Sequence, residues 1–165
     1  MTGGADPVAD GPPTVIGDGV FRVRSAAVVR SGDAVLTCAH GSRLSEFLPG
    51  GRVRRTESAY HACERELMEE IGVPLPIGRL HLMVENFVST PGDDVHEIVF
   101  CFDVDGADLD LDDARGWGVD HTFRWRTRDA LTHSAFEPMR LAPLLFDAGS
   151  AVRSVVFRDG ELVSS

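Results

Sequence analysis

The sequence predicts a single α/β domain, and three observations lead to this fold class. Several stretches show the two-residue alternation or the short apolar runs of β-strands. One stretch near the middle of the chain has the apolar period of a helix and clear signals at both ends. The 165 residues, 43% hydrophobic and 25% charged, suffice for one core and leave no room for a second catalytic domain.

The chain is expected to begin with a tail. Residues 1–18 are rich in glycine, proline, alanine and aspartate and show no periodicity. Such a composition is typical of a disordered or loosely docked segment. Residues 19–165 are then expected to form the single domain.

A β-hairpin is predicted at the start of this domain. Residues 21–30 (FRVRSAAVVR) and 34–40 (AVLTCAH) have strand character around a Ser-Gly-Asp turn. Arg22 and Arg24 share one face of the first strand, because side chains alternate along a strand. They are candidates to bind a phosphate or a base, and solvent-facing arginines are the alternative interpretation.

The best-marked element is a helix that begins near Ser58. Thr56 and Ser58 are suitable N-caps, and Gly72, followed by Val73 and Pro74, supplies a left-handed stop and a breaker. Its apolar side chains gather on one side, where a core would cover them: Tyr60, Cys63, Leu67 and Ile71.

Three carboxylates occupy an adjacent face of this helix. Glu66, Glu69 and Glu70 are spaced i, i+3 and i+4, so neighbouring pairs repel by roughly 0.2–0.5 kcal/mol, and the last turn also disfavours anions. A bound divalent cation would reverse this repulsion. For an isolated ExxEE motif, the alternative is a solvated acidic face.

These glutamates belong to a longer pattern. Residues 51–73 match G-x5-E-x7-R-E-U-x-E-E-x-G-U, where U is a bulky aliphatic residue. Average residue frequencies would produce such a match about once in ten million chains of this length. Chance therefore does not explain the pattern.

The segment resembles the Nudix box, and the chain is identified as a member of the Nudix hydrolase family, which includes the MutT-like nucleotide hydrolases. The resemblance implies a Nudix-type α/β/α sandwich with a mixed central sheet, in which the box forms a loop-helix-loop. It also implies cleavage of a diphosphate linkage in a nucleoside triphosphate or a nucleoside diphosphate joined to another group. Mg²⁺ is the expected cofactor because it prefers oxygen ligands, and Mn²⁺ is expected to substitute.

The resemblance also assigns roles within the box. The three glutamates would act as metal ligands or general base, and which one is the base stays open. The Gly50 carbonyl would be a further ligand, and Arg65 with Glu57 would form a supporting pair. The predicted catalytic residues are thus Glu57, Arg65, Glu66, Glu69 and Glu70.

Basic residues beside the box affect the expected substrate. Arg52 joins Arg22 and Arg24 as a predicted substrate-binding residue. Many family members continue the glycine pair as G-G-x-x-E-x-G-E, whereas this chain has Arg54 and Thr56 at the inner two positions. An acidic position has become basic, so the substrate of any one relative is a weak guide here.

Two long antiparallel strands are expected after the box. They lie at residues 76–89 and 95–105, around a Pro-Gly-Asp-Asp turn. Glu97 is predicted to point inward near the start of the second strand and is the first candidate for an extra metal ligand or base. Glu85 is the second candidate, and a structural salt bridge is the alternative for either residue.

The remaining elements complete the sheet and cover its second face. Residues 106–118 are predicted to form an acidic surface loop without the glycine and final glutamate of a calcium loop. A strand at 121–126, a short helix capped by Thr127 and a helix at 136–146 should follow. Residues 152–163 form a predicted hairpin.

A base-stacking residue would come from the aromatic side chains near these elements. Core packing is the alternative for each of them. The candidates are Phe87, His96, Trp125 and Phe136.

Charge and cysteine content limit the partners and the compartment. A net charge of −10 disfavours extended nucleic acid and anionic membranes, but not a small anionic substrate neutralised locally. Cys38, Cys63 and Cys101 are expected as buried free thiols, without a zinc spacing. With no signal peptide or membrane span, a cytoplasmic location is predicted. A homodimer stays open.

Three functions are compatible with these features. The first is a divalent-cation-dependent pyrophosphohydrolase. The second is a Nudix-like domain that senses a nucleotide without turnover, although such domains lose box glutamates and this chain keeps all of them. The third is an isoprenyl diphosphate isomerase, which needs a cysteine and further metal ligands that are not matched here.

Overall fold

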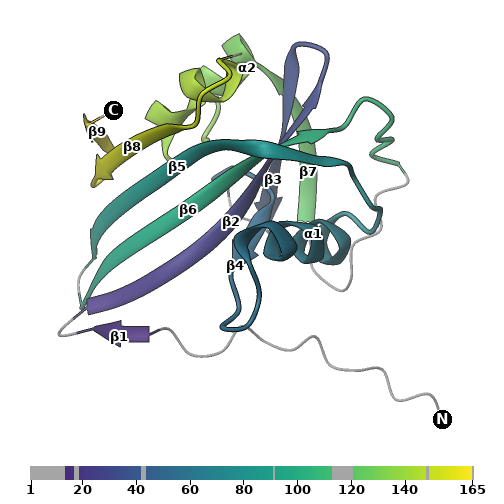
Figure 1. Cartoon of the computed structure of the whole chain (residues 1–165). Coiled ribbons are helices and arrows are strands. Elements are labelled where there is room, and N and C mark those ends of the chain that lie inside the picture. The colour runs from purple at the N-terminus through teal and green to yellow at the C-terminus, as the bar shows by residue number, and fades with distance from the viewer. Residues whose placement is uncertain are drawn as a thin grey trace.

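A mixed β-sheet forms the centre of the molecule (Figure 1). The computed structural model describes residues 14–16, 19–41, 44–90, 92–112, 121–147 and 149–164. Within this part of the chain the sheet has nine strands: β1 (Thr14–Ile16), β2 (Gly19–Ser31), β3 (Ala34–His40), β4 (Gly50–Arg52), β5 (Ile77–Thr90), β6 (Asp93–Asp105), β7 (His121–Thr127), β8 (Arg153–Arg158) and β9 (Glu161–Ser164).

The strand order is β7-β3-β2-β6-β5-β8-β9, with β1 and β4 paired to β2. The β2–β6 and β5–β8 pairs are parallel, and the other pairs are antiparallel. The predicted hairpins β2–β3, β5–β6 and β8–β9 are all present. The last turns at Asp159 and Gly160, whose φ angles of 49° and 81° suit a two-residue hairpin turn.

Helices cover both faces of this sheet (Figure 1). Helix α1 (Ala59–Glu70) packs its buried side chains against one face, with Cys63, Leu67 and the following Ile71 in one core cluster. Helix α2 (Arg128–Thr132) and the 3₁₀ helix η1 (Met139–Phe146) contribute to a second cluster on the other face. The predicted α/β/α sandwich is confirmed.

Several details differ from the expected elements. Thr14–Ile16, inside the expected tail, forms β1, and residues 1–13 and 17–18 lie outside the described part. The helix expected at 136–146 is the shorter η1, in which Pro143 lacks a backbone donor. Tyr60 was expected in the core but is 38% exposed; it lies in the first turn of α1, and its ring contacts Phe102 edge to face.

The expected burial of the cysteines is confirmed within the described residues. All three cysteines are buried and free. Residues 106–112 form turns and coil after β6, whereas residues 113–118 of the expected acidic loop lie outside the described part. In the described part of the chain, every helix is too short or too polar to pass through a membrane.

Candidate active site

Helix α1 is capped as its sequence predicts. The Ser58 hydroxyl accepts a hydrogen bond of 3.1 Å from the His61 backbone N–H, which satisfies one free donor of the first turn. At the other end Gly72 has a φ of 89°, a conformation that favours glycine. The helix is therefore held between two defined ends, and its acidic face lies over the loop that contains the glycine pair.

The two glycines of the box bring backbone and carboxylate close together. Gly50 has a φ of 141°, and a Cβ there would lie 2.2 Å from the Ser25 carbonyl oxygen. A Cβ on Gly51 would lie 2.3 Å from Oε1 of Glu66. Both distances are far below van der Waals contact. Glycine at these positions therefore lets β4 pair with β2 and leaves space for the Glu66 carboxylate.

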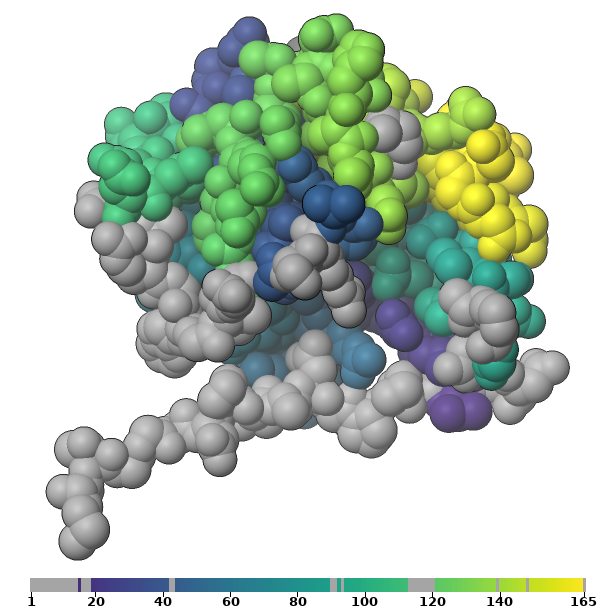
Figure 2. Space-filling model, turned by 180° about the vertical axis from the view of Figure 1, so that it is seen from behind, coloured from purple at the N-terminus to yellow at the C-terminus, as the bar shows by residue number. Residues whose placement is uncertain are grey.

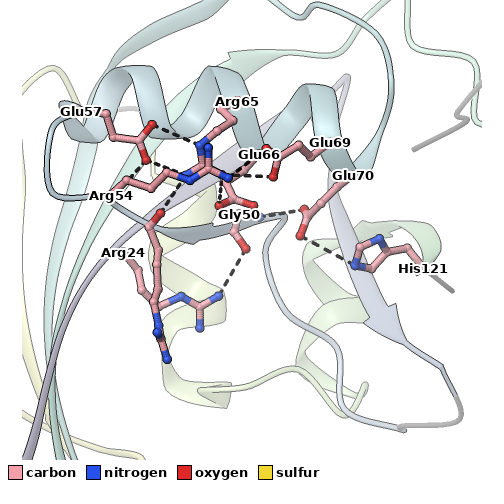
Figure 3. Close-up of polar contacts among 10 residues, drawn as sticks. Arg24, Gly50, Arg54, Glu57, Arg65, Glu66, Glu69, Glu70 and His121 are labelled. Carbon is pink, nitrogen blue, oxygen red and sulfur yellow. Dashed lines mark hydrogen bonds and ion pairs between the residues drawn. The ribbon is translucent and has the colours of Figure 1, made fainter. Parts of the chain in front are cut away.

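Arg65 is the centre of a hydrogen-bond network (Figure 3). Its guanidinium donates to both carboxylate oxygens of Glu57, at 3.1 and 2.6 Å, and to the Arg52 carbonyl at 2.9 Å. It also donates to Glu66 at 2.6 Å and to Glu69 at 3.1 Å. The hydrogen bonds from Arg65 lower the pKa of Glu57. One arginine thus orients three carboxylates of the box.

Arg54 adds a second positive charge to this side of the site. Its guanidinium donates to Glu69 at 3.3 Å, and its backbone N–H donates to Glu57 at 2.8 Å. Arg54 therefore places a cation in direct contact with one of the box glutamates.

Glu70 lies in different surroundings, deeper in the protein. It is 6% exposed, and its Oε2 accepts a hydrogen bond of 2.9 Å from the Gly50 N–H. Its Oε1 lies 3.8 Å from Nε2 of His121 (Figure 3). Burial, followed by the charge of Glu66, raises the pKa of Glu70 to about 8. A nearby divalent cation would favour its charged form.

The residues expected to bind substrate lie at different distances from the box. Arg24 donates to the Gly50 carbonyl at 3.3 Å, and its NH1 lies 3.9 Å from Glu97. Arg22 lies on the same strand as Arg24, and its Nε is buried without a hydrogen-bond partner. Arg52 contributes its carbonyl to Arg65. Of the three arginines, Arg24 thus contacts the box through its side chain.

The two carboxylates proposed from outside the box have different partners. The Glu97 side chain is 12% exposed and faces Arg24. The Glu85 carboxylate lies 2.8 Å from Nε2 of His96, and both side chains are about two-fifths exposed. The His96 ring stacks on Phe87 with centroids 4.4 Å apart. Glu97 therefore lies next to Arg24, which contacts the box, whereas Glu85 belongs to a surface cluster with His96 and Phe87.

A cavity of about 600 Å³ lies on the sheet face opposite α1, and Arg24 links it to the box, because Arg24 lines the cavity and donates to the Gly50 carbonyl. Figure 2 looks onto this face, where the surface is hollowed between the teal strands, the yellow C-terminal hairpin and the blue segment near residue 47. Arg24, Asn86 and Glu97 line the cavity with apolar side chains such as Val99 and Phe136. Phe136 is 1% exposed and belongs to the core, as its alternative interpretation predicted.

Two histidines near Glu70 were not identified as site residues from the sequence. His40 ends β3 and His121 begins β7, and the two are direct register partners. A ring nitrogen of each lies with a Glu70 oxygen in a group whose atoms are all within 4.8 Å of one another. A histidine at the end of one strand and another at the start of a later strand were a weak signal, because nothing local showed that these strands pair.

The fold and the box geometry together define a Nudix-type domain. A family model described as the NUDIX domain matches residues 20–145. The chain belongs to the NUDIX domain family, which confirms the family and the class of enzyme, a Nudix hydrolase, expected from the box.

Solved structures show the same fold at low identity. A MutT protein from Bacillus halodurans is 18% identical, with a TM-score of 0.63 over 87% of this chain and 95% of its own. An ADP-ribose pyrophosphatase from Streptococcus suis is 14% identical (TM-score 0.57; 81% and 98% covered). A MutT NUDIX hydrolase from Burkholderia pseudomallei is 21% identical (TM-score 0.55; 76% and 97% covered). No curated protein matches the sequence significantly.

Proposed function

We propose that this chain uses Mg²⁺ to hydrolyse a diphosphate linkage in a nucleoside triphosphate or in a nucleoside diphosphate joined to another group. The observation that supports this most strongly is the convergence of Glu66, Glu69 and Glu70 next to Gly50 and Arg24. The S. suis relative is named as an ADP-ribose pyrophosphatase, which is consistent with this reaction class. The products would be a nucleoside monophosphate and the phosphorylated remainder.

The donor atoms fit a magnesium ion. Carboxylate oxygens of the three glutamates and the Gly50 carbonyl are the oxygen ligands that Mg²⁺ prefers, and Mn²⁺ would substitute. Two of these glutamates are also buried: Glu66 is 7% exposed and Glu70 is 6% exposed. Buried carboxylates need a compensating positive charge. When bound, the ion would neutralise phosphate oxygens and make a water molecule more acidic.

The residues of the chain position the other parts of the reaction. Arg65 holds Glu66 and Glu69 in defined orientations, which matters because catalysis depends on preorganised charge. Arg24 reaches from the cavity to the box and is placed to bind a phosphate group. One of the carboxylates would accept the proton of the attacking water, and which one stays open.

The cavity supplies a place for the nucleoside. Its volume of about 600 Å³ lies within the roughly 300–1,000 Å³ typical of small-molecule sites. Glu97 remains a proposed extra ligand or base because it lines this cavity beside Arg24. Arg22 and Arg52 remain predicted substrate contacts, and the cytoplasmic location remains a prediction from composition.

A substrate panel tests this function. Nucleoside triphosphates, dinucleoside polyphosphates, ADP-ribose and nucleotide sugars would be assayed for phosphate-containing products with Mg²⁺ or Mn²⁺. We expect at least one to be hydrolysed, and Glu69→Gln to abolish that activity. The matched control is Glu64→Gln, because Glu64 is exposed on the same helix. Equal rates in wild type and Glu69→Gln would refute the site. Nucleotide binding without any turnover would favour the sensor alternative.

A further inference from the structure

We propose that His40, Glu70 and His121 form a second cation site, with two nitrogen ligands and one oxygen ligand, beside the oxygen-rich site of the box. Such a donor set suits Zn²⁺, Co²⁺ or Ni²⁺ rather than Mg²⁺, because imidazole binds borderline transition metals well. The site requires no hydrolytic activity, so it stands or falls independently of the proposed function.

The three side chains come from three different elements that are fixed to one another. His40 is the last residue of β3 and His121 the first of β7, and the two are register partners. Their rings contact edge to face, with centroids 4.2 Å apart. Glu70 reaches them from the last turn of α1. Ligands on paired strands and a packed helix are held more precisely than ligands on loops.

To hold a tetrahedral ion, the donor atoms must come together from separations of up to 4.8 Å to about 3.4 Å. Metal–ligand bonds of about 2.1 Å place tetrahedral donor atoms about 3.4 Å apart. The Glu70 Oε1 and His121 Nε2 atoms are 3.8 Å apart, and all three donor atoms lie within 4.8 Å of one another. At 3.8 Å the carboxylate and the imidazole are too far apart for a good direct hydrogen bond. The spacing is closer to that of two ligands of one metal.

The Glu70 carboxylate is oriented for this role. The Gly50 N–H holds its Oε2 at 2.9 Å, while Oε1 faces His121 (Figure 3). Such hydrogen bonds to ligating carboxylates are a regular feature of metal sites. Glu66 and Glu69 differ because they accept hydrogen bonds from arginine side chains. Of these three glutamates, Glu70 is therefore the one whose oxygen faces an imidazole nitrogen.

Burial and charge also favour a divalent ion over a salt bridge. The side chains of His121 and Glu70 are 5% and 8% exposed. Two imidazole rings and a carboxyl group are thus gathered in a buried place, where a bound divalent cation would stabilise the charged form of Glu70. Three protein ligands would also leave a coordination position for water or a phosphate oxygen.

Co²⁺ binding to the full chain tests the site. Titration in an excess of Mg²⁺, followed by visible absorption and calorimetry, should show one equivalent of Co²⁺ with nitrogen ligation. His40→Ala and His121→Ala should each weaken this binding by at least about 100-fold, the upper range for loss of a supporting partner. His133→Ala is the matched control, because His133 follows the last residue of α2 and its side chain is 75% exposed.

Two further measurements keep the proposal decisive. If an alanine variant does not fold, side-chain ¹⁵N spectra of the wild type with Zn²⁺ should shift two histidines, assigned with His40→Gln and His121→Gln, and leave His133 in place. Glu69→Gln should lose hydrolysis but keep Co²⁺ binding. Binding that survives in both histidine variants, or no shift at these rings, would refute the second site even if hydrolysis is found.

Discussion

The two ends of the acidic row on α1 lie in opposite electrostatic surroundings. Glu66 and Glu69 contact arginines, with Arg65 between them. Glu70, the next residue along the helix, is buried and faces His121, and its pKa is raised to about 8. The difference shows that equivalent letters in one motif acquire different chemistry from the elements that pack against them. The predictions below test this contrast, from the largest expected effect to the smallest.

Glu70→Gln should affect both candidate cation sites. Hydrolysis should fall roughly 100- to 10,000-fold, the range for a lost acid–base or charge-stabilising group, and Co²⁺ binding at the histidines should also disappear. Steady-state kinetics and Co²⁺ titration measure the two effects. Glu64→Gln should change neither. Loss of hydrolysis with full Co²⁺ binding would show that Glu70 belongs to the site of the box but not to the histidine site.

Arg65→Lys should damage the arginine-rich end alone. Lysine keeps the charge but cannot reproduce the planar fork that binds Glu57, Glu66 and Glu69 together. We expect a loss of about 10- to 100-fold in kcat/KM, as for other groups that orient ligands. Co²⁺ binding should stay within about twofold of wild type. Parallel losses of hydrolysis and Co²⁺ binding would mean that the two ends are not separate.

Gly51→Ala should displace one carboxylate without removing it. A Cβ at this position would lie 2.3 Å from Glu66 Oε1, so the side chain or β4 must move. Overpacking of this kind costs about 1–3 kcal/mol. We expect that loss in a denaturant titration and about a tenfold lower rate. Gly149→Ala, where nothing lies within 4 Å, is the matched control. A fully active Gly51→Ala variant would argue against a fixed Glu66.

An arginine–carboxylate pair away from the box gives the smallest effect on hydrolysis. Glu46 accepts hydrogen bonds from Arg126 and Thr37, and the bond from Arg126 is the main reason that its pKa is lowered. Glu46→Gln should destabilise the fold by roughly 1.5–3 kcal/mol. Hydrolysis by the folded fraction should be unchanged.

The pH dependence of this pair follows from the same pKa shift. Because the folded pKa lies below the ordinary 4.5, the folded state binds fewer protons. The stabilisation is therefore complete above pH 4.5 and is lost as the pH falls through the folded pKa. Wild type and Glu46→Gln should converge in stability at low pH. A constant difference between pH 3 and 7 would contradict this assignment.

Local signals predicted much of the fold because they act within a few residues. Ser58 and Gly72 mark the ends of α1, and Asp159 with Gly160 turns the last hairpin. Each depends on the chemistry of its own segment. Tyr60 was misplaced because a helical period identifies a face but not how completely the neighbouring segments cover each side chain on it.

The site divides in the same way. The spacing within the box predicted Arg65 and the three glutamates as site residues, since all four lie on one helix. His40 was missed because its significance depends on β3 pairing with β7, about eighty residues further along the chain. The orientation of Glu97 toward Arg24 likewise depends on β2 lying beside β6.

From its sequence alone, this protein has a defined family, a capped helix and a row of acids at metal-binding spacing, because these properties depend on neighbours in the chain. The tertiary structure decides which of those acids contacts arginine, which is buried beside histidine, and that Arg24 lines a cavity on the other face of the sheet. Those properties arise from packing between distant segments, whose register no local pattern contains.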